Sequence, residues 1–138
     1  HGDLVAFHRV VANLLVNAIQ AYNTKPGRKQ PIVVTTWDDN AVLYISINDH
    51  GSGIAQTDLP HIFEEFYTTK KRLGTGLGLG LASAKQVIEQ NFGGSITATS
   101  SPTTGTIFTL GIPLHESTNR TISAARPKLP GSRSKSKR

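Results

Sequence analysis

The 138-residue sequence contains no cysteine and no methionine. The lack of cysteine excludes a disulfide framework, a thiol nucleophile and a cysteine-ligated zinc site. The sequence also lacks an uninterrupted run of about 18 apolar residues, which a membrane-spanning helix would need, and it begins without the pattern of a secretory signal. We therefore expect a soluble, cytoplasmic chain, which is compatible with a membrane anchor elsewhere in a longer protein.

Acidic residues are missing from the C-terminal end, where seven Lys and Arg residues follow Glu116 but no Asp or Glu does. The whole chain holds 15 basic and 9 acidic residues, so subtracting the seven leaves 8 basic against 9 acidic residues in positions 1–116. The net charge of +6 therefore belongs to the C-terminal segment and gives no reason to expect a specific nucleic-acid partner. Residues 117–138 are rich in Ser, Pro, Lys and Arg without apolar periodicity. We expect a single domain at 1–116 followed by a disordered basic tail.

The spacing of apolar residues predicts two helices and four strands. The helical pattern runs from Asp3 to Tyr22 and from Gly78 to Phe92, with a short helical turn between Leu59 and Phe63. The β-rich runs are Ile32–Trp37, Val42–Asn48, Ser95–Ser100 and Thr106–Ile112. The first pair is joined by Asp38-Asp39-Asn40 and the second by SPTTG, so each pair predicts a hairpin. We predict an α/β fold, a two-layer sandwich of a mixed, mostly antiparallel sheet with helices on one face.

Two asparagines interrupt the first predicted helix, which is otherwise apolar almost all round. Asn13 and Asn17 are four residues apart and so share one face, although Asn is a mediocre helix former. One interpretation is a solvent-exposed face, which Arg9 and Gln20 would extend. The other is that an amide oxygen ligates a hard cation of the kind that accompanies phosphates. The pattern alone leaves both open.

A carboxylate falls at the end of an apolar strand face. Asp49 continues the alternation of Ile45 and Ile47, and Gly51 and Gly53 follow it. A carboxylate in such a place is costly unless something donates a hydrogen bond to it. The glycines would allow a ligand to approach the backbone closely, or the segment could be a simple turn in which Asp49 bonds local amides.

GTGLGLGLA, residues 74–82, places glycine at every second position from Gly74 to Gly80. Glycine is a poor strand former, so this alternation indicates a backbone that approaches a partner closely rather than a strand. We expect a loop that passes into the second helix. The preceding basic segment, Thr68–Arg72, is either a solvated loop or part of a mobile segment that neutralises phosphate.

Five segments in this order resemble the ATP-binding catalytic domain of sensor histidine kinases, where they are known as the N, G1, F, G2 and G3 boxes. The segments are NLLVNAIQA (13–21), DHGSGI (49–54), FEEFYTTK (63–70), GTGLGLGLA (74–82) and TGT (104–106). The resemblance runs from about Asp3 to Pro113, and NAIQA and FYTTK are most similar to the nitrogen-regulation type. The family often has Lys and an aromatic or His residue where Gln20 and Ala21 stand here. The resemblance implies the Bergerat-type ATP-binding fold.

The resemblance also implies roles for individual residues. Asn17 would coordinate Mg²⁺, and Asn13 would contact the polar end of the nucleotide. Asp49 would accept a hydrogen bond from the adenine amino group, and Lys70 is a candidate phosphate contact and, with the two asparagines, a candidate catalytic residue. Phe63 and Phe66 would anchor a lid from about residue 55 to 73. The other implied ATP-binding residues are Gly51, Gly53, Ile54, Phe63, Thr69, Gly74, Thr75, Gly76, Leu77, Gly78 and Thr106.

The function implied by the resemblance is binding of Mg-ATP and transfer of its γ-phosphate to a histidine. That histidine would lie on a separate helical dimerisation domain, which this chain does not contain, and a response regulator would be the next partner. The full-length protein would be a homodimer and this domain alone a monomer. Relatives that hydrolyse ATP carry a glutamate where Asn13 stands, and an amide cannot take a proton from water at neutral pH. The alternatives are a serine kinase of the anti-sigma-factor type and a non-catalytic nucleotide-binding regulator.

Overall fold

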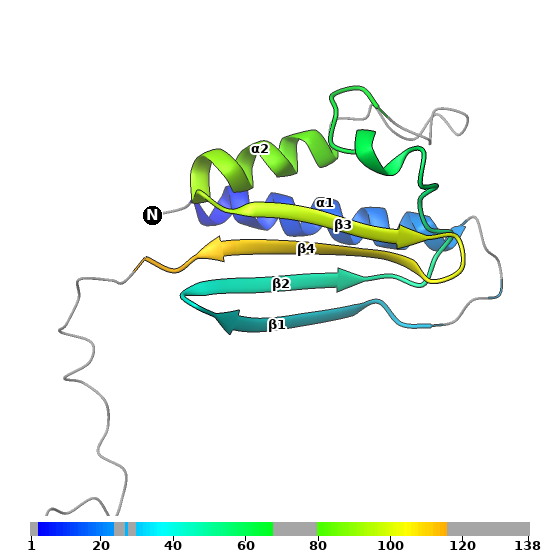
Figure 1. The fold of residues 1–138 in the computed structure, drawn as a ribbon, viewed down its shortest axis with the longest axis horizontal. Helices are drawn as coiled ribbons and strands as arrows, with labels where there is room; N and C mark the ends of the chain where they lie inside the picture. Colours follow the sequence, from blue (N-terminus) through cyan, green and yellow to red (C-terminus); the bar gives the residue numbers. More distant parts are fainter. Residues whose placement is uncertain (1–2, 24–26, 28–29, 68–79, 116–138) are drawn as a thin grey trace, which may run out of the picture.

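The structure is a computed structural model that describes residues 3–23, 27, 30–67 and 80–115 (Figure 1). The elements in chain order are α1 Leu4–Asn23, β1 Val33–Asp39, β2 Val42–Asn48, the 3₁₀ turn η1 Leu59–His61, α2 Gly80–Phe92, β3 Ser95–Ser101 and β4 Gly105–Pro113. Both predicted helices, the four predicted strands and the predicted turn near Leu59 are confirmed. The predicted start of the second helix at Gly78 lies outside the described residues.

The four strands form one sheet in the order β1-β2-β4-β3 (Figure 1). β1 pairs with β2, β2 with β4 and β3 with β4, each time antiparallel. Among the described strands the sheet is therefore wholly antiparallel rather than mixed. The two hairpins lie side by side because β2 and β4, the inner strand of each, pair with one another.

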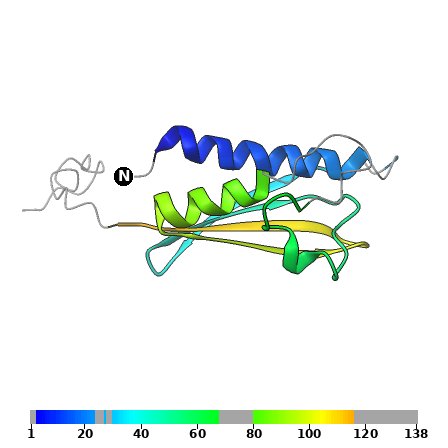
Figure 2. The same cartoon turned by 90° about the horizontal axis from the view of Figure 1, so that it is seen from above.

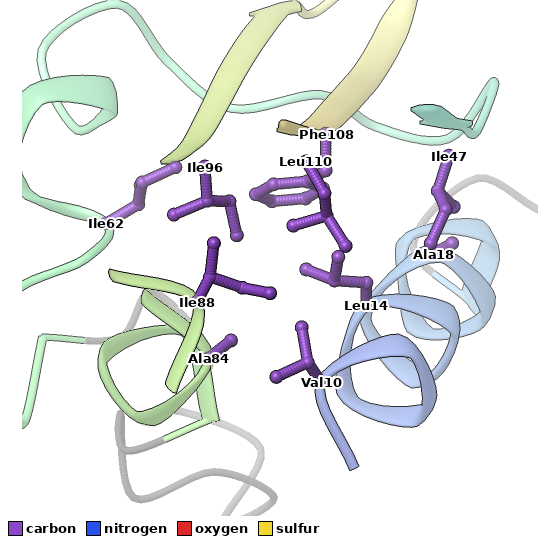
Figure 3. Close-up of a cluster of buried hydrophobic side chains, with 10 residues drawn as sticks. All are labelled: Val10, Leu14, Ala18, Ile47, Ile62, Ala84, Ile88, Ile96, Phe108 and Leu110. Carbon is purple, nitrogen blue, oxygen red and sulfur yellow. The ribbon is translucent and has the colours of Figure 1, made fainter. Parts of the chain in front are cut away.

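Both helices lie on the same side of the sheet, which confirms the two-layer arrangement (Figure 2). Their buried side chains meet those of the inner sheet face in one core (Figure 3). This core consists of Val10, Leu14 and Ala18 from α1, Ala84 and Ile88 from α2, Ile47, Ile96, Phe108 and Leu110 from the sheet, and Ile62. The period of two along the strands and of about four along α1 brings these residues onto facing surfaces.

The turn of the first hairpin lies one residue later than predicted. Asp38 and Asp39 belong to β1, because Asp39 pairs with Val42, and the two turn residues are Asn40 and Ala41. Their φ angles are +48° and +61°, as a two-residue turn of type I′ requires at both central positions. The sequence pointed to the wrong residues because alanine rarely adopts a positive φ and gives no turn signal there.

Helix α1 begins after Asp3, whose carboxylate oxygen Oδ1 accepts a hydrogen bond from the backbone nitrogen of Val5 at 2.8 Å. Such a cap satisfies a donor that the first helical turn leaves unpaired. By length and composition α1 could cross a membrane, with a mean hydropathy of 1.4 over Leu4–Tyr22. The core helix of a soluble protein passes the same test, and α1 packs one side against α2 and the sheet. On its other side, Val16 and Ile19 are exposed.

Candidate functional site

Parts of several elements meet at one edge of the molecule, on the right in Figure 1. They are the C-terminal half of α1, the end of β2, the turn between β3 and β4, and the start of α2. These ends carry most of the predicted site residues that the structure describes. The antiparallel register brings them together, since the end of one strand lies beside the start of the next.

Asp49 lies at the centre of this end and its residue is only 2% exposed. Its carboxylate oxygen Oδ1 accepts hydrogen bonds from the backbone nitrogens of Gly51 at 2.9 Å and Thr106 at 3.3 Å. The backbone nitrogen of Asp49 in turn donates to the carbonyl of Thr106 at 2.9 Å. These bonds supply the donors that a buried carboxylate requires. They hold it in one orientation between residues far apart in the sequence.

The segment after Asp49 crosses the C-terminal end of α1 at very short range. A Cβ atom on Gly51 would lie 2.5 Å from the Cβ of Ala21, and the nitrogen of Ser52 donates to the carbonyl of Ala21 at 3.2 Å. The backbone nitrogen of His50 also donates to the hydroxyl of Tyr22 at 2.9 Å. Ala21 has no side-chain atom beyond Cβ, which leaves the space that this crossing uses.

Gly53 approaches the hairpin between β3 and β4 in the same way. Its φ is +71°, and a Cβ atom there would lie 2.0 Å from the carbonyl oxygen of Ser101. No side chain fits in that position and conformation. The two glycines thus press the loop 49–54 between α1 and the β3–β4 hairpin, which supports the prediction that they shape a pocket beside Asp49.

Asn13 lies between the two helices. Its side-chain nitrogen Nδ2 donates to the carbonyl oxygen of Gly80 at 3.4 Å, so it contacts the first residue of α2. Asn17 lies one turn later on α1 and is half-buried. Because Ala21 follows Asn17 by four residues on the same helix face, the asparagines form a row from the start of α2 to the loop 49–54. The solvent-face interpretation is therefore not supported for Asn13.

Asn13 and Asn17 could hold a magnesium ion only together with further ligands such as waters and phosphate oxygens. Within the described residues, no group of three His, Asp or Glu side chains gathers that could hold a metal ion. Mg²⁺ usually keeps several waters and binds through few protein oxygens together with phosphate oxygens. The amide oxygen of Asn17 suits that chemistry.

The two phenylalanines that the sequence assigned to one role differ in position. Phe63 is half-buried, and its ring packs edge to face against that of Phe108 with 6.3 Å between the ring centroids. The Nζ atom of Lys85 lies 5.7 Å from the centroid of the Phe63 ring. Phe66 is 63% exposed and has a φ of +63°. Phe63 packs against the core, as an anchor would, whereas the exposed Phe66 does not.

Other predicted residues lie outside the described part of the chain. They are Thr69, Lys70, Gly74, Thr75, Gly76, Leu77 and Gly78. Their roles remain predictions from the resemblance. Gly80, the last glycine of the alternating segment, is the first residue of α2.

Sequence reasoning missed Ser100, which lies among the predicted residues Ile54 and Thr106. The hydroxyl of Ser100 accepts a hydrogen bond from the backbone nitrogen of Ile54 at 2.7 Å and lies 2.7 Å from the hydroxyl of Thr106. A signal was present, because Ser100 follows Ile96 and Ala98 in the period of two on the inner sheet face. It is the same signal that identified Asp49.

A hollow of about 550 Å³ lies at this end of the sheet, and part of its lining comes from the sheet face away from the helices. Its lining includes no Lys or Arg and consists of Gln30, Asn48, His50, Thr99, Ser100, Ser101, Thr103, Thr104, Gly105 and Ile107. Asn48 and Thr99 both lie in register with Ile107, on the face away from the helices. A lining with so little positive charge does not suit a triphosphate.

Comparisons with known proteins identify relatives of this chain. Sensor histidine kinase RppB of Synechocystis sp. is 40% identical over 118 residues, a match that covers 82% of this chain and 24% of that protein. Sensor histidine kinase ZraS of Escherichia coli K12 is 40% identical over 107 residues, covering 78% and 21%. The chain thus spans about a quarter or less of the length of these curated relatives.

A solved structure has the same fold. The catalytic domain of histidine kinase ThkA, in a nucleotide-free form, matches with a TM-score of 0.68 and 32% identity over 82% of this chain and 69% of that chain. The family described as Histidine kinase-, DNA gyrase B-, and HSP90-like ATPase matches residues 2–116. Since that match includes every described element and the loop around Asp49, the chain belongs to this ATPase family and has the fold of a histidine kinase catalytic domain.

Proposed function

We propose that the chain is the catalytic, ATP-binding domain of a two-component sensor histidine kinase. It binds Mg-ATP and transfers the γ-phosphate to a histidine on a separate helical domain. The observation that carries this proposal is the buried carboxylate of Asp49, fixed by two backbone amides beside a loop that only glycines can form. The likeness to the catalytic domain of a histidine kinase supports it further.

Asp49 would bind the adenine end of the nucleotide. Its oriented carboxylate is an acceptor, and the exocyclic amino group of adenine is a donor. A hydrogen bond to an ionised acceptor in a buried site is among the stronger ones. Gly51 and Gly53 would keep the wall of the pocket free of side chains.

The phosphate end would lie toward Asn13, Asn17 and the start of α2. The first turn of a helix presents unpaired backbone N–H groups and a partial positive charge, which favour anionic oxygens. Asn13 contacts Gly80 at that point. Mg²⁺ held through Asn17 would offset the charge that accumulates on the phosphates.

The chemistry of Asn13 favours transfer to a protein side chain over hydrolysis. In the transfer a histidine nitrogen attacks the γ-phosphorus, the bond to the bridging oxygen breaks, and ADP leaves. A neutral imidazole nitrogen attacks with its lone pair, so the site does not have to remove a proton from the nucleophile first. Hydrolysis needs a base for water, and an amide side chain cannot be one at neutral pH.

The partners follow from this role. The phosphoryl group passes from the helical domain to a response regulator, and the full-length protein is a homodimer through the helical domain, while this domain alone is monomeric. The supply of ATP places the domain in the cytoplasm. The names of the relatives support a sensor kinase, and the nitrogen-regulation type stays a prediction.

The direct test is incubation with ATP labelled at the γ-phosphate, with and without the helical domain of the same protein. We expect acid-labile label on a histidine of the helical domain and none on this chain alone. Acid-stable label on serine would replace the proposal with a serine kinase of the anti-sigma-factor type. Nucleotide binding without transfer would leave a non-catalytic regulator.

Substitution of the adenine contact tests the binding mode. Asp49→Asn keeps the size of the side chain but removes its charge and one acceptor, so we expect ATP affinity to fall by about 10–100-fold. Binding is measured by titration calorimetry. Asp38→Asn, which removes an exposed carboxylate on β1, is the control and should bind ATP like the unmodified chain. Equal affinity in both variants would show that Asp49 does not contact adenine.

A further inference from the structure

The hydroxyl of Ser100 joins the loop 49–54 to the hairpin between β3 and β4. It accepts a hydrogen bond from the nitrogen of Ile54 at 2.7 Å, donates to the carbonyl of Gly105 at 3.0 Å, and lies 2.7 Å from the hydroxyl of Thr106. The carbonyl of Ser100 also accepts a bond from the side chain of Gln56 at 2.7 Å. Ser100, which belongs to none of the five family segments, thus joins segment 49–54 to segment 104–106.

The number of hydrogen atoms fixes the direction of the bond between the two hydroxyls. A serine hydroxyl has one donor hydrogen and two acceptor lone pairs. Carbonyl oxygen cannot donate, so the Ser100 hydrogen goes to Gly105, and the lone pairs accept from Ile54 and from Thr106. Thr106 therefore donates its only hydroxyl hydrogen to Ser100.

This direction decides what Thr106 offers to a ligand. With its hydrogen used, its hydroxyl oxygen can only accept. Thr106 is 3% exposed, and its backbone nitrogen bonds the carboxylate of Asp49, so the two residues are neighbours. A base that meets the carboxylate of Asp49 would therefore also come close to the threonine oxygen, and both groups can accept a hydrogen bond.

We propose that Ser100 is a positioning residue that sets the base selectivity of the site by holding Thr106 as an acceptor. The inference rests on the proposed function, in which Asp49 faces the base. Two such accepting groups suit a purine that carries an amino group at position 6. They reject a purine with a carbonyl oxygen there, because two acceptors face one another without a hydrogen between them.

A merely structural role of Ser100 would make a different prediction. Loss of packing or of loop order would weaken every nucleotide to a similar degree and leave the selectivity unchanged. Ser101 provides the matched comparison, since its hydroxyl bonds only Thr103 and Thr104 among the hydrogen bonds described for it. It therefore belongs to the turn and not to the site.

The experiment measures binding of ATP and of inosine triphosphate, which has a carbonyl in place of the 6-amino group, to the full chain and its variants. The unmodified chain should prefer ATP. In Ser100→Ala the Thr106 hydroxyl is free to turn and donate, so the preference for ATP should fall by roughly tenfold, the effect of about one hydrogen bond. Ser101→Ala should keep the preference of the unmodified chain.

Ser100→Cys repeats the test with a side chain of similar size, whose sulfur is a weak donor and a weak acceptor. Ser100→Cys should also lose the preference for ATP. It replaces Ser100→Ala in the test if circular dichroism shows that the alanine variant does not fold. In a Thr106→Val background there is no hydroxyl to turn, so Ser100→Ala should no longer change the ratio.

The outcomes separate this inference from the proposed function. If the unmodified chain binds no ATP, the proposed function fails. If it binds ATP with a preference that Ser100→Ala and Ser100→Cys leave intact, only the role of Ser100 is wrong. An equal loss of selectivity in Ser101→Ala, or a persistent effect of Ser100→Ala in the Thr106→Val background, would also overturn it.

Discussion

At the scale of single residues, the site depends on the small side chains of two residues that lie in close contact. Gly51 has no Cβ atom, and Ala21 has nothing beyond its own, so loop 49–54 can lie directly on the end of α1. Asp49 receives its bond from the Gly51 amide only while that crossing is kept. A single methyl group at this point should therefore affect both stability and nucleotide binding.

Gly51→Ala would place a Cβ atom 2.5 Å from the Ala21 Cβ and 2.7 Å from its carbonyl atoms. We expect the free energy of unfolding to fall by about 1–3 kcal/mol, as in overpacked sites, and ATP affinity to fall with it. Denaturant unfolding and ATP titration measure the two effects.

The control is Gly93→Asn, at a glycine with a φ of +63° and no atom within 4 Å of an added Cβ. Asparagine tolerates that conformation better than other side chains, so we expect a loss below about 1 kcal/mol and unchanged ATP affinity. Equal stability losses in the two variants would contradict the steric argument.

Tyr67 carries a local pH dependence. The hydrogen bond that its hydroxyl donates to Asp58 raises the pKa of Tyr67 above 10.0, and desolvation and the negative charges of Asp58 and Glu64 add to this. A raised pKa means that the fold favours the neutral phenol. The stability that the Tyr67–Asp58 hydrogen bond contributes is fully present below pH 10. It is lost as the pH rises through the raised pKa of Tyr67.

Asp58→Ala should therefore make Tyr67 ionise at lower pH. The measurement is the ultraviolet absorbance of tyrosinate during an alkaline titration of the folded protein. Tyr67→Phe identifies which step belongs to this residue among the three tyrosines. A titration curve unchanged by Asp58→Ala would show that the hydrogen bond does not form in solution.

At the scale of elements, α1 contributes both to the core and to the site. Leu14 is fully buried between the sheet and α2 (Figure 3). Asn13 and Asn17, before and after it in α1, belong to the row of asparagines in the candidate site. The helix therefore fixes the asparagines by packing. Its apolar face was predicted from spacing, and the buried residues Leu14 and Ala18 confirm it, whereas Leu4 is 77% exposed. Val10, which the spacing did not include, is also buried.

Leu14→Ala should lower the free energy of unfolding by about 2–5 kcal/mol, because it removes methyl groups from a closely packed core and leaves a cavity. Urea denaturation followed by circular dichroism measures it. Val16→Ala on the same helix, where the side chain is 49% exposed, is the matched control and should cost less than about 1 kcal/mol. A similar loss for both would mean that α1 does not pack as described.

Element boundaries were predicted well where one pattern repeats, and less well at turns. β2 has the bounds expected from its alternating residues, since Val42–Asn48 is both the predicted and the observed strand. The preceding turn was misplaced, because its residue Ala41 adopts a positive φ through the pairing of the flanking strands rather than through its own preference. Strand pairing across a hairpin outweighs the propensity of a single residue.

At the scale of the whole molecule, the folded domain and the basic tail are predicted to be independent. The last contact described near the C-terminus is the bond from the nitrogen of Leu114 to the carbonyl of Ala41 at 2.7 Å. Positions 1–116 carry a net charge of −1 against +6 for the whole chain. The tail should thus decide how the protein interacts with polyanions, and the domain should decide how it binds nucleotide.

Removal of residues 117–138 should leave the free energy of unfolding within about 0.5 kcal/mol of that of the full chain. ATP affinity should also stay the same. Retention on a cation-exchange column should disappear, because the net positive charge is lost. A large loss of stability on truncation would contradict the division of the chain at residue 116.

The sequence by itself determined the elements, the face of each that enters the core, and the presence of a carboxylate at the end of an inner strand face. These follow from periodicity, which is a local property of the chain. The five segments also sufficed to recognise the family. Local patterns do not, however, say which distant residue meets which.

Only the tertiary structure decided the partners of Asp49 and the role of Ser100. Asp49 bonds Thr106, which is 57 residues away, and Ser100 bonds Ile54 across 46 residues. Such contacts exist because β2 and β4 pair and the loop 49–54 then lies against the hairpin from β3 to β4. Within the β3–β4 hairpin, the Ser100 hydrogen goes to Gly105, which leaves Thr106 as an acceptor. The hairpin is local, but only the tertiary fold brings it against Ile54 and Asp49 and so makes the acceptor part of the site.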